Sequence, residues 1–269
     1  MAGGPVGFFD SGEGGLTVAK VVARLLPGEN LLYVCDTARF PYGPRPLPEA
    51  RRFFLQFLPF FESQGCKLLV VACNTATTAA LDLLDRLPVP TIGVVWPGAR
   101  SAAQATRNGR IGVAATEATC AAGIYPQLIR EANPDARVLQ VPCPILVIRA
   151  EEGIIGGPEV RTEVQRCLTP LLEAGVDTLV LGCTHFPHMQ SVIADVVGPD
   201  VTLIDPGAET GRAVSEWLSG HGMLNPQAQG SRRFYTTGDP DRFARIAGRL
   251  WPGGVFRAER IAVEEIAME

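Results

Sequence analysis

Short apolar runs bounded by turn residues recur along the chain, and each predicts a buried β-strand. The runs lie at residues 6–9, 31–34, 68–72, 111–115, 138–141, 178–181 and 201–204. The segments between most of them have helical periodicity. For example, Phe53, Phe57 and Phe61 recur at i, i+4 and i+8, with a kink expected at Pro59. Alternating strands and helices predict an α/β fold with mainly parallel sheets.

Two pairs of similar segments indicate an internal duplication. Val-Gly-Phe-Phe-Asp-Ser at 6–11 resembles Ile-Gly-Val-Ala-Ala-Thr at 111–116, and Leu-Val-Val-Ala-Cys-Asn at 69–74 resembles Leu-Val-Leu-Gly-Cys-Thr at 179–184. The identities are few, so a chance likeness between strand-to-helix turns stays the alternative. A duplication predicts two similar, pseudo-symmetric lobes with a cleft between them, formed by residues 1–96 plus 209–269 and by residues 97–208.

The composition excludes several classes of partner. The 269 residues are 46% hydrophobic, and 24 Lys plus Arg against 28 Asp plus Glu give a net charge of -4. This balance leaves no excess positive charge for a phosphate backbone, so nucleic acid is not an expected partner. No apolar run approaches the ~18 residues of a membrane span, and the first residues lack the basic region of a signal peptide. We therefore expect a cytoplasmic protein without a membrane partner.

Two of the seven cysteines, Cys73 and Cys183, occupy matched positions between a predicted strand and a predicted helix. Ligands of open α/β sheets bind beyond the carboxyl ends of the strands, and a helix amino terminus favours a thiolate. These two cysteines therefore have a physical reason to be reactive. We expect the other five to be reduced thiols with structural roles. Cys35 and Cys143 lie near strand ends, and we expect buried packing residues at Cys66, Cys120 and Cys167, in or next to helical stretches.

Polar residues follow both cysteines directly. Asn74 and Thr75 follow the first, and Thr184 and His185 follow the second. Their side chains add hydrogen-bonding groups to the backbone N–H groups of a starting helix, an arrangement that suits an anionic substrate. The turn at residues 10–15 adds a carboxylate, a hydroxyl and several glycines before another helix, expected to begin near Leu16.

Two other interpretations of these residues stay open at this point. Cys183, His185 and His188 are potential metal ligands, but their spacing matches no common site, so no metal is expected. Asp10 at a strand end suits a phosphoryl-accepting nucleophile, but Gly12 stands where many such phosphatases carry a second aspartate. A strand-end aspartate is also often only a helix cap.

Two opposed thiols suit the inversion of a carbon acid. One sulfur removes a proton from one face of the substrate, and the other returns a proton to the opposite face. No cofactor is required if fixed N–H donors stabilise the charge on the α-carboxylate and water is excluded. Lys20 and Lys67 are the only lysines, in an apolar helical run and at a strand edge, which disfavours a pyridoxal enzyme. The residues therefore predict a racemase.

Ten short motifs follow one another in a specific order. They are Phe-Asp-Ser-Gly at 9–12, Gly-Gly-Leu-Thr at 14–17, Asp-Thr-Ala-Arg at 36–39, Pro-Tyr-Gly at 41–43, Ala-Cys-Asn-Thr-Ala at 72–76, Pro-Gly-Ala-Arg at 97–100, Glu-Glu-Gly at 151–153, Leu-Gly-Cys-Thr-His at 181–185, Gly-Ala-Glu-Thr at 207–210 and Thr-Gly-Asp at 237–239. With this set, nearly the whole chain resembles the bacterial glutamate racemases of the cofactor-independent aspartate/glutamate racemase superfamily.

The resemblance implies a fold, an activity and a set of site residues. It implies two α/β lobes with the site between them, catalysis by Cys73 and Cys183, and supporting acid/base roles for Asp10, His185 and Glu151. The implied substrate contacts are Asp10, Ser11, Tyr42, Gly43, Asn74, Thr75, Thr184 and His185. It also implies glutamate as substrate, no cofactor, a homodimer, and D-glutamate supply for peptidoglycan. A racemase of aspartate or another acidic amino acid, or a non-catalytic two-lobed amino-acid-binding protein, stays an alternative.

Five positions depart from the family pattern. Trp96 stands where glutamate is common, Cys35 where glycine is common, and Arg149 and His188 where apolar residues are usual. Glu13 replaces a typically apolar residue of the substrate turn. We expect Glu13 to be the departure with the largest effect on turnover.

Overall fold

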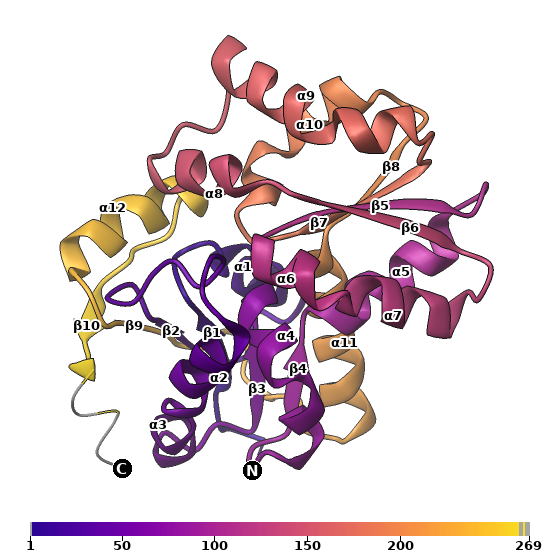
Figure 1. Cartoon of the computed structure of the whole chain (residues 1–269). Coiled ribbons are helices and arrows are strands. Elements are labelled where there is room, and N and C mark those ends of the chain that lie inside the picture. Colours follow the sequence, from indigo (N-terminus) through magenta and orange to yellow (C-terminus); the bar gives the residue numbers. More distant parts are fainter. Residues whose placement is uncertain (1, 264–265, 267–269) are drawn as a thin grey trace.

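The computed structural model describes residues 2–263 and 266, which fold into two α/β lobes, each built on a parallel sheet (Figure 1). The strand order is β10-β9-β2-β1-β3-β4 in the first sheet and β6-β5-β7-β8 in the second. The first sheet contains β1 (Val6–Asp10), β2 (Leu31–Cys35), β3 (Leu68–Val71), β4 (Thr91–Gly93), β9 (Arg232–Thr236) and β10 (Ala258–Arg260). The second contains β5 (Arg110–Ala115), β6 (Arg137–Pro142), β7 (Thr178–Gly182) and β8 (Thr202–Ile204).

The seven apolar runs all form strands, as predicted, and the mixed α/β class with parallel sheets is confirmed. Sequence periodicity missed three further strands, β4, β9 and β10. Strand β4 has only three residues, β9 begins with the exposed Arg232 and Arg233, and β10 is half-exposed or exposed throughout. None of them has the continuous apolar run that marks a strand buried on both faces.

Helices connect the strands and cover both sheets. They are α1 (Leu16–Leu25), α2 (Leu47–Leu55), α3 (Leu58–Ser63), α4 (Asn74–Ala80), α5 (Val95–Ala105), α6 (Glu117–Ala122), α7 (Ile124–Ala132), α8 (Pro144–Glu151), α9 (Pro158–Glu173), α10 (Gln190–Val197), α11 (Pro206–Gly220) and α12 (Pro240–Leu250), with 3-10 turns η1 (Leu81–Arg86) and η2 (Phe186–Met189). Helix α1 begins at Leu16, as predicted. The kink expected at Pro59 is wrong, because α2 ends at Leu55 and Pro59 lies in the first turn of a new helix, where proline is tolerated.

The strand topology confirms the duplication. The order β2-β1-β3-β4 in the first sheet corresponds to β6-β5-β7-β8 in the second. Val6 pairs with Leu68, and Ile111 pairs with Thr178. Adding 105 residues (111 minus 6) to the first position and 110 (178 minus 68) to the second converts one pair into the other. The central strands of the two sheets therefore pair in the same register.

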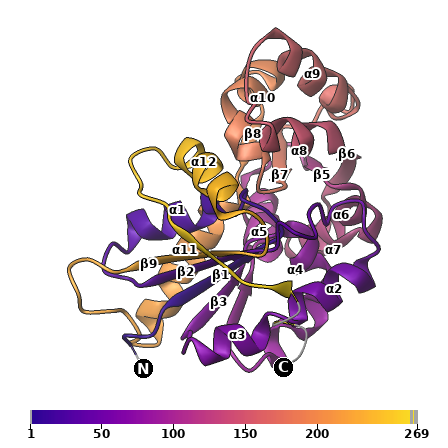
Figure 2. The same cartoon turned by 90° about the vertical axis from the view of Figure 1, so that its left-hand side faces the viewer.

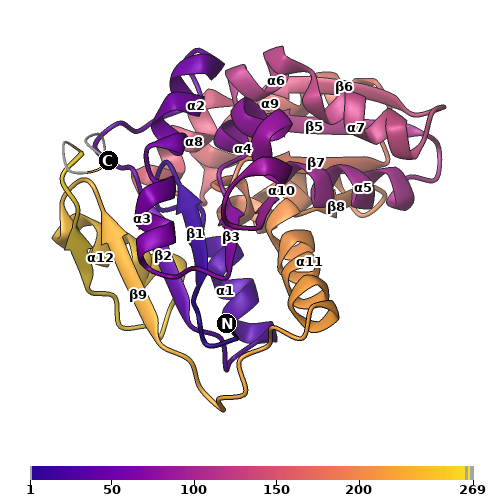
Figure 3. The same cartoon turned by 90° about the horizontal axis from the view of Figure 1, so that it is seen from below.

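A shared layer of helices holds the two sheets together. Helix α1 contacts α11, α11 contacts α5, and α5 contacts α7, so these helices form a row between the sheets (Figure 3). Their apolar side chains pack in one cluster that includes Val70 of the first sheet and Val180 of the second. Helices α2 to α4 cover the other face of the first sheet, and α8 to α10 that of the second. The predicted lobe boundaries at 96/97 and 208/209 fall within α5 and α11, which link the sheets.

In the described part of the chain, none of the helices combines the length and the hydropathy needed to cross a bilayer.

A buried ion pair joins several chain segments at the amino-terminal end of the first sheet. Lys67 Nζ lies 2.6 Å from Glu29 Oε2, and neither side chain is appreciably exposed. The same ammonium group donates hydrogen bonds to the carbonyl oxygens of Ala2 and Met223. Because buried charges are stable only when they are paired, this contact ties the region after α11 to the start of β3.

Lys67→Met should destabilise the protein by about 3–5 kcal/mol, because it leaves the buried Glu29 carboxylate without its counter-charge. Urea-induced unfolding measures the change. The other lysine supplies a matched control, because Lys20 is exposed and Lys20→Met should change the unfolding free energy by less than about 0.5 kcal/mol. Equal stabilities of the two variants would contradict the role assigned to the ion pair.

Candidate active site

A small cavity lies between the lobes and is lined by residues from both. The lining residues are Ser11, Phe40, Pro41, Tyr42, Gly43, Cys73, Asn74, Thr75, Thr116, Val147, Cys183, Thr184 and His185. The structure thus brings most of the predicted site residues together around one space. Asp10 and Glu151, the remaining two, stand behind the lining and hydrogen-bond to it.

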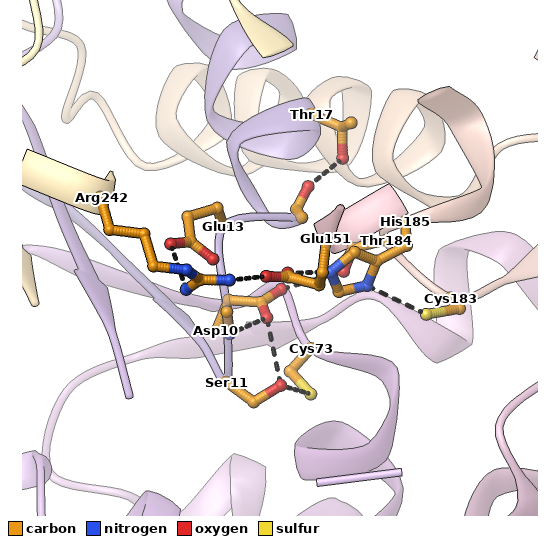
Figure 4. Close-up of polar contacts among 12 residues, drawn as sticks. Asp10, Ser11, Glu13, Thr17, Cys73, Glu151, Cys183, Thr184, His185 and Arg242 are labelled. Carbon is orange, nitrogen blue, oxygen red and sulfur yellow. Dashed lines mark hydrogen bonds and ion pairs between the residues drawn. The ribbon is translucent and has the colours of Figure 1, made fainter. Parts of the chain in front are cut away.

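Cys73 lies directly before α4, with its sulfur at the helix amino terminus. The backbone N–H of Ala76 donates to Cys73 Sγ at 3.4 Å, and Ser11 Oγ lies 3.5 Å from the same sulfur (Figure 4). Burial, with a further contribution from the Asp10 carboxylate, raises the pKa of the Cys73 thiol to about 12. In the absence of a ligand, Cys73 is therefore a protonated thiol, suited to donate a proton.

Cys183 follows β7 and begins a chain of hydrogen-bonding groups. Its Sγ lies 3.5 Å from His185 Nδ1, and His185 Nε2 lies 2.6 Å from Glu151 Oε1. Burial opposes a charged imidazole, but the Cys183 sulfur and the Glu151 carboxylate together raise the pKa of His185 well above its ordinary value. A protonated ring donates hydrogen bonds to both neighbours, so Cys183 Sγ has a cationic hydrogen-bond donor beside it.

The Asp10 carboxylate connects the two lobes behind the cavity. Its Oδ1 accepts a hydrogen bond from the Gly12 N–H at 2.9 Å, and its Oδ2 accepts one from Thr184 Oγ1 of the second lobe at 3.2 Å. Burial raises the pKa of Asp10 to about 6. The alternative role as a cap of α1 is wrong, because the N-cap residue of that helix is Gly15, which has no side-chain cap. A Cβ on Gly15 would lie 2.6 Å from Asp10 Oδ2, so the close approach requires glycine.

The residues after the first cysteine are held in defined orientations. Asn74 Oδ1 accepts a hydrogen bond from Tyr125 Oη at 2.6 Å, which leaves the amide NH₂ group as a donor. Thr75 Oγ1 lies 3.0 Å from Thr116 Oγ1 of the second lobe. Gly43 packs against the same threonine, because an added Cβ would lie 2.9 Å from Thr116 Cγ2.

Thr116 and Val147 line the cavity but were not predicted, and the hydroxyl group of the predicted Tyr42 bonds to a residue outside the lining. Tyr42 lines the cavity, but its hydroxyl donates to the buried Asp36 carboxylate. Thr116 corresponds to Ser11 in the duplication, and this signal was sufficient to find it. Val147, inside α8, carries no local sequence signal for its place in the cavity.

The other five cysteines lie outside the cavity lining, as expected. Cys35, Cys66 and Cys143 are buried, whereas Cys120 and Cys167 are only half-buried, so the prediction of buried packing is wrong for these two. Their positions along α6 and α9 expose part of each side chain.

The metal-site interpretation lacks a geometric basis. Within residues 2–263 and 266, no three His, Cys, Asp or Glu side chains form a group that could hold a metal ion. His188 belongs to η2 rather than to the cavity lining, and burial lowers its pKa to about 3.

The cavity is small. Only about 20 Å³ is open to a water-sized sphere, which corresponds to about one water molecule. A ligand larger than a water molecule therefore requires the lining residues to move apart.

Comparisons with known proteins agree with this geometry. A family model described as Asp/Glu/Hydantoin racemase matches residues 15–214. A glutamate racemase of Symbiobacterium thermophilum is 65% identical over 260 residues, covering 96% of this chain and 94% of that protein. The crystal structure of a glutamate racemase isoform from Bacillus anthracis gives a TM-score of 0.93 at 38% identity, covering 97% and 98% of the two chains. The glutamate racemase of Francisella tularensis in complex with D-glutamate gives 0.91 at 30% identity, covering 98% and 100%.

The raised pKa of Asp10 makes stability depend on pH. The folded protein binds this proton more tightly than the unfolded chain, so the contribution of Asp10 to stability is lost as the pH rises from about 4 to about 6. Relative to Asp10→Asn, the wild type should lose on the order of 3 kcal/mol over this range, at about 1.4 kcal/mol per pKa unit. Urea unfolding at several pH values measures the difference. Asp135→Asn, at an exposed aspartate, is the control, and a pH-independent difference for Asp10→Asn would contradict the raised pKa.

Proposed function

The chain belongs to the Asp/Glu/hydantoin racemase family, and we propose that it is a glutamate racemase that interconverts L-glutamate and D-glutamate. The observation that carries the proposal is the pair of sulfurs, Cys73 and Cys183, on equivalent turns of the two lobes and lining one cavity. The likeness to glutamate racemases along almost the whole chain favours glutamate over other acidic amino acids.

The two sulfurs act as base and acid on opposite faces of the α-carbon. In one direction Cys183, as a thiolate paired with His185, takes the α-proton, and the electron pair of the broken C–H bond delocalises into the α-carboxylate. The thiol of Cys73 then gives its proton to the other face, which forms the new C–H bond and inverts the centre. The enzyme is left with a thiol at Cys183 and a thiolate at Cys73, the state that acts on the opposite enantiomer.

Fixed polar groups stabilise the charge that develops on the substrate. The Asn74 amide, whose oxygen is held by Tyr125, supplies N–H donors, and Thr75 and Thr184 line the cavity beside it. The protonated His185 adds a positive charge beside Cys183. Such donors act most strongly in a site from which water is excluded, as in this small cavity.

Substrate entry requires a change in the arrangement of the lobes, because the cavity has room for about one water molecule. Helices α5 and α11 connect the sheets, so we propose that the lobes rotate about these helices to admit the substrate. Closure after binding removes water and brings both sulfurs to the α-carbon.

Two alternatives are tested by the same experiments. A racemase of aspartate or another acidic amino acid would use the same sulfurs, whereas a non-catalytic binding protein would have no need of both. The cytoplasmic location, the supply of D-glutamate for peptidoglycan and the independence from a cofactor belong to the proposal and rest on the family resemblance.

Purified protein treated with a chelator and free of pyridoxal phosphate should invert L-glutamate in deuterated water and incorporate one α-deuterium. Polarimetry and loss of the α-proton NMR signal measure both events. L-Aspartate provides the comparison substrate. Exchange on aspartate alone would establish the first alternative, and binding without exchange would establish the second.

Cys73→Ala and Cys183→Ala should each abolish inversion, a loss of at least about 100-fold, because each removes one of the two proton-transfer groups. Any remaining α-proton exchange should be confined to one enantiomer, and the two variants should differ in which one. Cys120→Ser is the matched control, since this half-buried cysteine lies outside the cavity lining and should leave inversion intact. Full activity of either alanine variant, or exchange of the same enantiomer by both, would refute the two-base mechanism.

The proposal includes a homodimer. Ile148, Ile154 and Ile155 expose apolar side chains at α8 and the segment after it, which suits a protein contact. Sedimentation velocity should give twice the 28.7 kDa mass of one chain, and a single-chain mass at micromolar concentration would contradict it.

A further inference from the structure

One arginine joins the two lobes beside the site. Arg242 lies on α12 of the first lobe, which extends toward α8 of the second (Figure 2). Its Nη2 is 2.8 Å from Oε2 of Glu151, at the carboxyl end of α8. Its Nη1 is 3.2 Å from Oε1 of Glu13, in the turn before α1 (Figure 4). A single guanidinium therefore bridges two carboxyl groups that come from different lobes.

Glu13 anchors the arginine on the first lobe. The side chain of Glu13 is 1% exposed, whereas that of Arg242 is 40% exposed. Burial and the neighbouring Glu151 carboxylate raise the pKa of Glu13 to about 8, so Glu13 keeps its proton at neutral pH and its Oε1 accepts a hydrogen bond from the guanidinium. The planar fork of a guanidinium can contact both at once, whereas a lysine presents one point charge.

The bridge reaches only one of the two sulfurs. Glu151 uses Oε2 for Arg242 and Oε1 for the Nε2 of His185, whose Nδ1 faces Cys183. Cys73 instead has Ser11 and the N–H of Ala76 as its hydrogen-bonding neighbours. The two halves of the site therefore differ in their dependence on the arginine.

We propose that Arg242, held by Glu13, is a positioning residue for the Cys183 half of the proton-transfer pair. This inference rests on the proposed racemase function. By fixing one oxygen of Glu151, Arg242 keeps the other on His185, and these contacts span the two lobes because Glu13 and Glu151 belong to different lobes. Arg242 itself touches neither the cavity lining nor a sulfur among the described residues.

A one-sided defect has a specific kinetic signature. The two enantiomers have equal free energies in water, so any variant must lower kcat/KM by the same factor in both directions. The primary deuterium isotope effect has no such restriction. If proton transfer at Cys183 becomes slower, the isotope effect rises for the α-deuterated enantiomer that Cys183 deprotonates and falls for the other.

Arg242→Ala should lower kcat/KM by about 10- to 100-fold, the range expected when a catalytic group is displaced by up to ~1 Å. Its isotope effects on α-deuterated L- and D-glutamate should move in opposite directions. Arg242→Lys should recover only part of the rate. Arg245→Ala is the matched control, because Arg245 is exposed on the same helix and has no side-chain hydrogen bond or ion pair with the described residues. Equal changes in both isotope effects, or none, would overturn the inference.

A second variant separates positioning from stability. Arg242→Ala leaves two buried carboxyl groups without their shared cation, which by itself destabilises the fold. The double variant Glu13→Ala/Arg242→Ala also removes one of these carboxyl groups. Its unfolding midpoint should therefore lie between those of Arg242→Ala and the wild type, while its two isotope effects should still change in opposite directions. Recovery of the isotope effects together with stability would show that Arg242 has only a structural role.

A spectroscopic measurement tests the positioning even if the chain does not racemise glutamate. The short contact between His185 Nε2 and Glu151 predicts a downfield, slowly exchanging imidazole N–H proton resonance. Only three histidines are present, so His188→Gln and His221→Gln assign the signal. It should weaken or disappear in Arg242→Ala and persist in Arg245→Ala. An unchanged signal in Arg242→Ala would refute the positioning role, whereas absence of wild-type turnover would refute the proposed function alone.

Discussion

Parallel strand pairing in both sheets is the constraint on which the site depends. Because all strands of a parallel sheet end at the same edge, the turns after β1 and β3 lie together, and so do those after β5 and β7. The helical layer of α1, α11 and α5 holds these edges toward each other. Cys73 and Cys183 consequently line opposite parts of one cavity although 110 positions separate them in the chain.

The lobes share their topology but not their electrostatics. Cys73 has a hydroxyl neighbour and a raised thiol pKa, whereas Cys183 has a protonated imidazole as its neighbour. A reaction with an equilibrium constant of one is therefore performed by a site whose two halves are chemically different at rest. The two sulfurs therefore have different hydrogen-bonding neighbours before any substrate binds, and in the proposed mechanism each turnover exchanges their roles as base and acid.

Burial strengthens the electrostatic interactions that distinguish the two halves of the site, and it also places several carboxyl groups away from water. Asp10, Glu13 and Glu151 are carboxyl groups with little or no exposure, and they share the site with only a few cationic groups. In a poorly solvated cavity their interactions with the thiols and with His185 are stronger than in water. Burial therefore sets the protonation of the site as well as its exclusion of solvent.

The sequence by itself determined the features that depend on local pattern. The seven apolar runs, the duplication between residues 6–11 and 111–116, and the matched turns at Cys73 and Cys183 follow from periodicity and from what a strand-to-helix turn requires. The short or exposed strands β4, β9 and β10 escaped detection, because pairing with neighbours creates them rather than their own hydrophobicity.

The tertiary structure alone decided which groups interact across the cleft. Arg242 reaches Glu13, 229 positions away, and Glu151, 91 positions away. Val147 reaches the cavity from the interior of a helix. A pKa depends on burial and on the distances to charges brought together by folding, and neither quantity is encoded in the local sequence. Most of the candidate site residues were therefore visible in the chain, whereas their protonation states depend on the folded cavity.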